Sequence, residues 1–115
     1  MNTLNDLRDA VLKFASDRDW DQFHNPKNLS MSVSVEAAEL QELFMWKTPA
    51  ESQNLSAETR LKVEDEVGDI LICLVNFAAR SGIDPLAAAF RKLEKNSAKY
   101  PIEKARGHAR KYGEL

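Results

Sequence analysis

The chain has 115 residues, of which 30% are charged and 43% hydrophobic, and its formal net charge is -2. This length predicts a single domain over residues 1–115, and the slightly acidic balance excludes the basic surface that a nucleic acid polymer requires. No apolar run is long enough to cross a bilayer, and the single cysteine, Cys73, fits a reducing compartment. We therefore expect a cytoplasmic protein with no membrane partner.

Apolar spacing and helix caps predict an all-α fold of four helices, and no alternating strand pattern persists anywhere. The expected helices cover residues 3–16, about 28–44 or 28–46, 57–80 and 85–99. Their expected N-cap residues are Thr3, Asn28 or Ser30, Ser56 and Asp84. Gly82 and Pro101 are expected to terminate the third and fourth helices.

The segments between these helices differ in character. Residues 18–26 place Trp20 and Phe23 beside His24 and end at Pro26, so this stretch is either a loop folded back on the core or part of a binding site. Pro49 is expected to close the second helix, and residues 50–56 read as a small, polar connection. The tail, residues 106–112, is basic and weakly patterned.

Two acidic pairs stand out in apolar surroundings. Glu36 and Glu39 are three residues apart in the second helix, and Glu66 and Asp69 are three apart in the third. On a helix this spacing puts both side chains on one face. A single pair of this kind is usually a solvated surface, but carboxylates beside a core stripe need cations to compensate them. The two pairs together therefore predict a metal site.

The ligand type indicates which metal. A site made only of carboxylate oxygens suits Mg²⁺, with Mn²⁺ as a possible substitute. A di-iron bundle would need Glu-x-x-His on two helices. Neither His24 nor His108 has a glutamate three residues before it, so iron is disfavoured.

The third helix also bears on assembly. It is apolar all round from Ile70 to Val75, so it needs neighbours on every side. The fourth helix adds further apolar surface through Leu86, Phe90 and Leu93. We therefore expect a homo-oligomer, either a twofold dimer or a tetramer built as a dimer of dimers.

At these residues the sequence resembles the all-α, MazG-like nucleoside triphosphate pyrophosphohydrolases, and most of all their dCTP pyrophosphatase branch. The family's metal motif, Glu-x-x-Glu followed after an interval by Glu-x-x-Asp, is matched by the two acidic pairs. The resemblance extends from about Leu4 to Tyr112. It is sharpened by the stretches at residues 18–24, 42–47 and 96–101.

The resemblance implies a four-helix MazG-like bundle that assembles as a dimer or tetramer, with active sites at subunit boundaries. It implies that Trp20, His24 and Trp46 line a nucleotide pocket and that Asn96, Lys99 and Tyr100 lie near the phosphates. Arg106 or Lys111 would assist Lys99. The branch can carry a histidine and a tyrosine where this chain has Val11 and Cys73.

The expected reaction is Mg²⁺-dependent hydrolysis of a nucleoside triphosphate to the monophosphate and pyrophosphate, a nucleotide-pool house-cleaning activity. The expected substrate is dCTP or dATP. Glu36, Glu39, Glu66 and Asp69 would be both the metal ligands and the catalytic residues, one glutamate accepting the proton of the attacking water. Trp20 and Trp46 would sandwich the base.

Two alternatives remain open on the sequence. One is a non-catalytic helical oligomeric interaction module whose acidic cluster holds a structural cation. The other is an enzyme acting on a different phosphorylated compound, such as phosphoribosyl-ATP or a damaged nucleotide. Magnesium-dependent release of pyrophosphate from nucleotides would separate the first alternative from the enzyme, and a nucleotide panel would address the second.

Overall fold

The computed structural model describes residues 2–115, which form helices and connecting turns and contain no strand. One compact unit ends at Gly82 and a second begins at Ile83. The first contains three of the four predicted long helices: α1 (Leu4–Asp17), α2 (Pro26–Glu42) and α4 (Ala57–Arg80). The fourth, α5 (Pro85–Lys99), belongs to the second unit. The all-α prediction and the number of long helices are confirmed.

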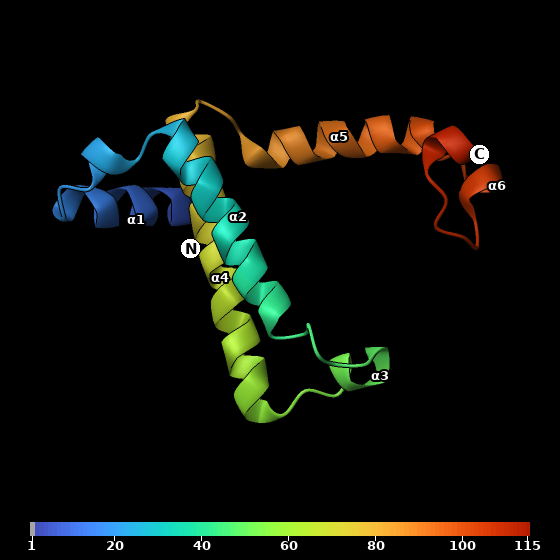
Figure 1. Cartoon of the computed structure of the whole chain (residues 1–115). Coiled ribbons are helices and arrows are strands. Elements are labelled where there is room, and N and C mark those ends of the chain that lie inside the picture. Colours follow the sequence, from blue (N-terminus) through green and yellow to red (C-terminus); the bar gives the residue numbers. More distant parts are fainter. Residues whose placement is uncertain (1) are drawn as a thin grey trace. The chain divides into compact units, whose positions relative to one another are not determined.

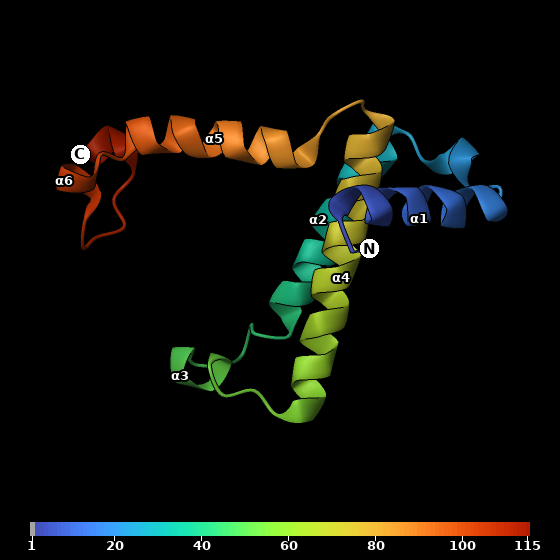
Figure 2. The same cartoon turned by 180° about the vertical axis from the view of Figure 1, so that it is seen from behind.

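In the first unit, α2 and α4 lie side by side and run antiparallel, and α1 packs against α4 (Figures 1 and 2). The buried hydrophobic side chains come from all three helices: Val11, Ala15, Leu29, Val75 and Ala78. On α4 they belong to its C-terminal half, and on α2 to its first turns. The core therefore lies where the start of α2 meets the end of α4, and the remainder of the α2–α4 pair is more open.

Local signals explain most of the helix ends. Thr3 and Asp6 form a reciprocal capping box at the start of α1, and Ser56 caps α4 by accepting from the backbone N–H of Thr59. Gly82, which follows α4, has φ of +67°, a conformation that glycine adopts without steric cost. These three predictions are confirmed.

The predicted start of α2 was wrong. The helix begins at Pro26, and its N-cap is Asn25 rather than Asn28 or Ser30. Pro26 disfavours the helical conformation at Asn25, as expected, but that leaves Asn25 extended and free to accept from the N–H of Asn28. A proline at the first helical position is compatible with a helix start because its missing N–H would have no partner there.

The connection to α4 is also more ordered than predicted. Pro49 does not close α2, which ends at Glu42, but opens a short helix, α3 (Pro49–Ser52). Thr48 and Glu51 form a second capping box there. The pattern Thr-Pro-x-Glu carried this signal. Upstream of α2, residues Asp21–Phe23 form a single 3₁₀ turn, η1, within the predicted loop.

The second unit contains α5, the short helix α6 (Ile102–Ala105) and a final 3₁₀ turn, η2 (Tyr112–Glu114). Asp84 caps α5 by accepting from the N–H groups of the next turn, as predicted. The apolar residues Leu86, Phe90 and Leu93 are exposed in the described chain. Within residues 2–115 no single helix combines the length and the apolarity that a membrane span needs.

Candidate active site

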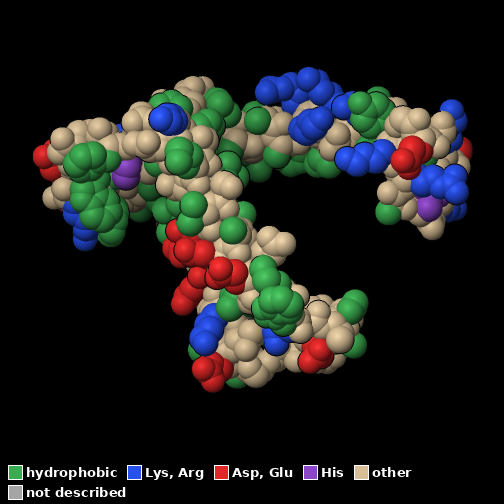
Figure 3. Space-filling view, in the orientation of Figure 1, with side chains coloured by type: hydrophobic (Ala, Val, Ile, Leu, Met, Phe, Trp, Pro, Cys, Tyr) green, Lys and Arg blue, Asp and Glu red, His purple; other side chains and the backbone are tan. Residues whose placement is uncertain are grey.

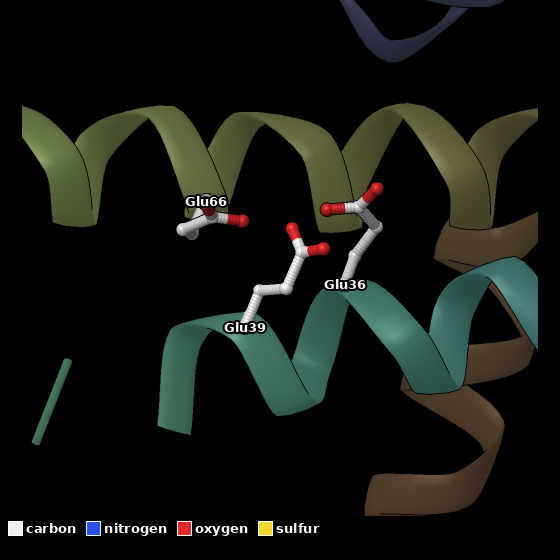
Figure 4. Close-up of side chains that lie close together, drawn as sticks. All are labelled: Glu36, Glu39 and Glu66. Atoms are coloured by element: carbon white, nitrogen blue, oxygen red, sulfur yellow. The ribbon is translucent and has the colours of Figure 1, made fainter. Parts of the chain in front are cut away.

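The acidic pairs meet between α2 and α4. Glu36 and Glu39 extend from α2 toward Glu66 on α4, and Figure 4 shows the three side chains in the space between the two helices. One carboxylate oxygen from each lies within 4.8 Å of the others. Acidic side chains gather over the same helix pair in the surface view (Figure 3). The convergence predicted from the two spacings is therefore present for three of the four carboxylates.

Asp69, the fourth predicted carboxylate, lies outside that group of three. It still acts on the group, because its negative charge raises the pKa of both Glu36 and Glu66. Asp69 follows Glu66 by three residues on α4, so the two share one face of the helix. The structure thus places Asp69 as an electrostatic neighbour of the three converging glutamates.

The ionised form of these glutamates is disfavoured by their surroundings. Burial raises the pKa of Glu36 to about 7, with further contributions from a hydrogen bond with Glu39 and from the charges of Glu39, Asp69 and Glu66. Burial also raises the pKa of Glu66, and the negative charge of Glu39 is the second cause of that rise. No salt bridge among the described residues reaches this cluster. The described residues therefore supply no ion pair that would stabilise these carboxylates.

Two oxygen atoms show where that charge would fit. Oε2 of Glu36 and Oε2 of Glu66 are buried and have no hydrogen-bond partner. A buried carboxylate oxygen without a partner costs free energy, and a cation removes that cost. The donors are all oxygen atoms, which is the set that Mg²⁺ and Mn²⁺ prefer. The residues present therefore fit a divalent cation.

A second group of predicted residues lies before α2. The Trp20 ring packs edge-on against Phe14, with centroids 5.7 Å apart, and against His24, with centroids 6.4 Å apart. The guanidinium of Arg18 covers the Phe14 ring at 3.7 Å. Trp20 remains partly exposed, at 42%. The structure thus brings Trp20 and His24 together, with an open aromatic surface.

Trp46 lies at the other end of α2. Trp46 comes four residues after the last residue of α2, and Trp20 comes six residues before the first. The 17 residues of helix between them extend over roughly 25 Å. Trp46 is 90% exposed. Within one chain, therefore, Trp20 and Trp46 do not face each other across a base.

The remaining predicted residues belong to the second unit. Asn96 and Lys99 lie in the last turn of α5, and Tyr100 is its C-cap, donating its backbone N–H to the Asn96 carbonyl at 2.9 Å. Tyr100 packs edge-on against Tyr112, and the Lys99 ammonium lies 4.8 Å from the centre of the Tyr112 ring. Lys99 and Tyr100 thus both contact Tyr112, and Asn96 lies one helical turn before Tyr100.

The sequence reasoning missed Asn76 and Arg80. Both lie on α4 and contact His24 or its neighbour Asp21. The signal was present, because Asn76 is the one amide inside the apolar run from Ile70 to Ala79. It lies seven residues after Asp69, which is two helical turns and nearly the same face.

Comparison with known proteins identifies the fold family. The model of the MazG-like family matches residues 31–115. The chain belongs to the MazG-like family. It is 44% identical to human dCTP pyrophosphatase 1 and 43% identical to the Bos taurus protein of the same name, over 98% of this chain and 68% of each relative.

A solved structure agrees. A pyrophosphatase from Archaeoglobus fulgidus superposes with a TM-score of 0.81 at 37% identity, covering 88% of this chain and 94% of that one. The resemblance drawn from the sequence is confirmed, and the chain is an enzyme of the nucleoside triphosphate pyrophosphohydrolase class.

Proposed function

We propose that this enzyme hydrolyses a deoxynucleoside triphosphate, with dCTP as first candidate and dATP as second, to the monophosphate and pyrophosphate. The observation that carries the proposal is the convergence of Glu36, Glu39 and Glu66 with two buried, unpartnered oxygens. The names of the curated relatives favour dCTP. The proposed role of this activity is house-cleaning of the nucleotide pool.

Glu36, Glu39 and Glu66 would hold a divalent cation, Mg²⁺ or in its place Mn²⁺, with Asp69 adding negative charge beside them. A bound divalent cation supplies positive charge for the phosphate oxygens as the α–β bond breaks. The chain's own contribution is to fix the carboxylates on two packed helices, so that little reorganisation accompanies the reaction. A cluster carboxylate oxygen would also accept the proton of the attacking water.

The base would lie toward Trp20 and His24. On α4, Asp69 lies seven residues and Glu66 ten residues before Asn76, so these carboxylates and the His24 contact are separated by roughly 10–15 Å along the helix. A nucleotide bound along this face would have its phosphates near the carboxylates and its base near the exposed Trp20 ring. Stacking on an aromatic ring contributes about 1–3 kcal/mol per base.

Asn96, Lys99 and Tyr100 remain the proposed ligands of the outer phosphates. Lys99 is exposed and keeps its ammonium beside an aromatic ring, where a phosphate can still reach it. Arg106 and Lys111 follow in the same basic tail. These basic side chains would compensate the part of the phosphate charge that the metal ion at the carboxylates leaves uncompensated.

A homo-oligomer, dimer or tetramer, completes the proposal. Trp46 and Trp20 cannot sandwich a base within one chain, but a second copy could bring its Trp46 to the Trp20 of the first. The 90% exposure of Trp46 and the exposed apolar residues Leu86, Phe90 and Leu93 favour such an assembly.

The test is pyrophosphate release from a panel of ribo- and deoxynucleoside triphosphates, with Mg²⁺, with Mn²⁺ and with chelator. We expect release only with a divalent cation, the highest kcat/KM for dCTP, and lower values for CTP. Equal kcat/KM for CTP and dCTP would contradict the deoxy preference. No release from any nucleotide would instead support an interaction module with a structural cation.

A further inference from the structure

A chain of hydrogen bonds joins the segment before α2 to the end of α4. Asn76 Nδ2 lies 3.1 Å from His24 Nδ1, and Arg80 Nε donates to Asn76 Oδ1 at 3.0 Å. A terminal nitrogen of Arg80 also donates to Asp21 Oδ1 at 2.7 Å. Asn76 is only 5% exposed, and the Arg80 side chain 16%. The centre of the network, Asn76, is thus buried, where polar groups must be matched, whereas Asp21 at its end is exposed.

The network fixes the direction of each bond. A guanidinium can only donate, so the Asn76 atom that faces Arg80 is the carbonyl oxygen. The Asn76 amide nitrogen, which can only donate, therefore faces His24. Nδ1 of His24 must then accept, which leaves the ring proton on Nε2.

That proton is available to a ligand. In the part of the chain described here, no group hydrogen-bonds to His24 Nε2, and His24 is not fully buried. The partly exposed Trp20 ring packs beside the same imidazole. A hydrogen-bond donor of fixed orientation therefore lies next to a surface on which a planar ring can pack.

We propose that Asn76 is a positioning residue that holds His24 in the Nε2–H tautomer, so that His24 donates a hydrogen bond to an acceptor atom on the edge of a base packed near Trp20. Arg80 orients Asn76, and its bond to Asp21 ties the Trp20–His24 segment to α4. This inference rests on the proposed function, because it takes the base to lie at this end of the α2–α4 pair.

The inference has a consequence for substrate choice. The pairing edge of cytosine offers two acceptors, N3 and O2, whereas N3 of thymine carries a hydrogen and donates. A donor at Nε2 that is aimed at the N3 position therefore favours cytosine over thymine, whose acceptors on this edge are O2 and O4 instead. A site whose polar group is left unpaired rejects the wrong base strongly, since the unmatched group loses its contact with water.

The decisive variant is Asn76→Asp. It keeps the shape and the acceptor for Arg80, but it replaces the donor that faces His24 by a second acceptor. The ring proton should therefore move to Nδ1, and Nε2 should become an acceptor. Asn5→Asp, on the exposed face of α1, adds the same charge without touching the network and serves as the matched control.

Two readouts test this without turnover. The ¹⁵N chemical shifts of the His24 ring should show the proton on Nε2 in the wild-type protein and on Nδ1 in Asn76→Asp. By calorimetry, Asn76→Asp should bind the α,β-imido analogue of dCTP roughly tenfold or more weakly, while its affinity for tripolyphosphate stays within about twofold. A merely structural role would lower both affinities together.

The outcomes separate cleanly. An Nδ1–H tautomer in the wild-type protein overturns the inference even if the variant does not fold. If Asn76→Asp weakens the binding of the analogue and of tripolyphosphate equally, the inference is also overturned. The same holds if Asn76→Asp binds the analogue as tightly as the Asn5→Asp control does. The proposed function is refuted by a different measurement, the pyrophosphate-release assay, if the wild-type protein releases no pyrophosphate from any nucleotide.

Discussion

The two ends of the α2–α4 pair contrast in how their polar groups are matched. At the carboxylate end, Glu36, Glu39 and Glu66 face one another and two buried oxygens have no partner. At the other end, His24, Asn76 and Arg80 form a chain in which each polar contact is matched. The first end needs positive charge from outside the chain, whereas the second is held together by hydrogen bonds within the chain and offers the Nε2–H of His24 to a ligand. Removing a charge should therefore have opposite effects on the free energy of unfolding: loss of a carboxylate at the first end should not lower it, whereas loss of Arg80 at the second should.

The largest expected effect is on turnover. Glu66→Gln should lower kcat by orders of magnitude, because it removes one charge from the proposed cation site. In chelator, the same variant should melt at the wild-type temperature or above it, because it removes repulsion. The control is Glu64→Gln, on the same helix but exposed and paired with Arg60 at 3.4 Å. It should change neither property appreciably. A large loss of stability for Glu66→Gln in chelator would mean a structural role.

Next in size is stabilisation by the cation. Mg²⁺ at about 100 times its Kd should raise the free energy of unfolding by roughly 2.7 kcal/mol. Glu36→Gln should lose most of this gain, because Glu36 offers a ligand oxygen with no other partner. Thermal melting with and without Mg²⁺ measures both values. Equal gains in wild type and variant would place the cation elsewhere.

The matched end should respond in the opposite way. Arg80→Ala leaves the buried Asn76 Oδ1 without a donor and should lower the free energy of unfolding by about 1–3 kcal/mol, with or without Mg²⁺. Arg60→Ala removes an exposed cation from the same helix and should cost little. Urea denaturation in chelator compares them. If Arg80→Ala were as mild as Arg60→Ala, the contrast between the two ends would fail.

A pH dependence of stability is also expected. Glu36 has a pKa of about 7 in the folded protein against 4.5 for an ordinary glutamate, so between these values the folded state holds a proton that the unfolded state has lost. In chelator, stability should therefore fall as pH rises from about 4.5 to 7. Saturating Mg²⁺ competes with that proton and should reverse the slope. Denaturation curves across this range should show a smaller fall in Glu36→Gln than in the wild-type protein, because the contribution of Glu36 is lost while that of Glu66 remains.

The sequence predicted most of the fold and part of the site. Helix ends were predictable where a cap and a breaker coincide, as at Ser56 and Gly82. They were missed where a proline both ends one conformation and begins a helix, as at Pro26 and Pro49. The reason is physical: proline excludes the helical conformation only from the residue before it.

For the site, spacing placed the acidic pairs on helix faces, and packing then brought three of the four carboxylates together. The role of Asn76 was not predictable, because it depends on which side chain from another segment lies opposite it. The sandwich of Trp20 and Trp46 did not arise in one chain, because spacing along the sequence does not show that α2 separates them. Such pairings are decided by tertiary contacts between distant segments.

The central claim is that the converging carboxylates serve cation-dependent hydrolysis at the α–β bond. The most direct measurement is product analysis of dCTP incubated with Mg²⁺ and either wild-type protein, Glu66→Gln or Glu64→Gln. We predict dCMP and pyrophosphate from the wild-type and Glu64→Gln proteins, and almost no product from Glu66→Gln or from any sample in chelator. Formation of dCDP and phosphate, or equal turnover by Glu66→Gln, would contradict the account.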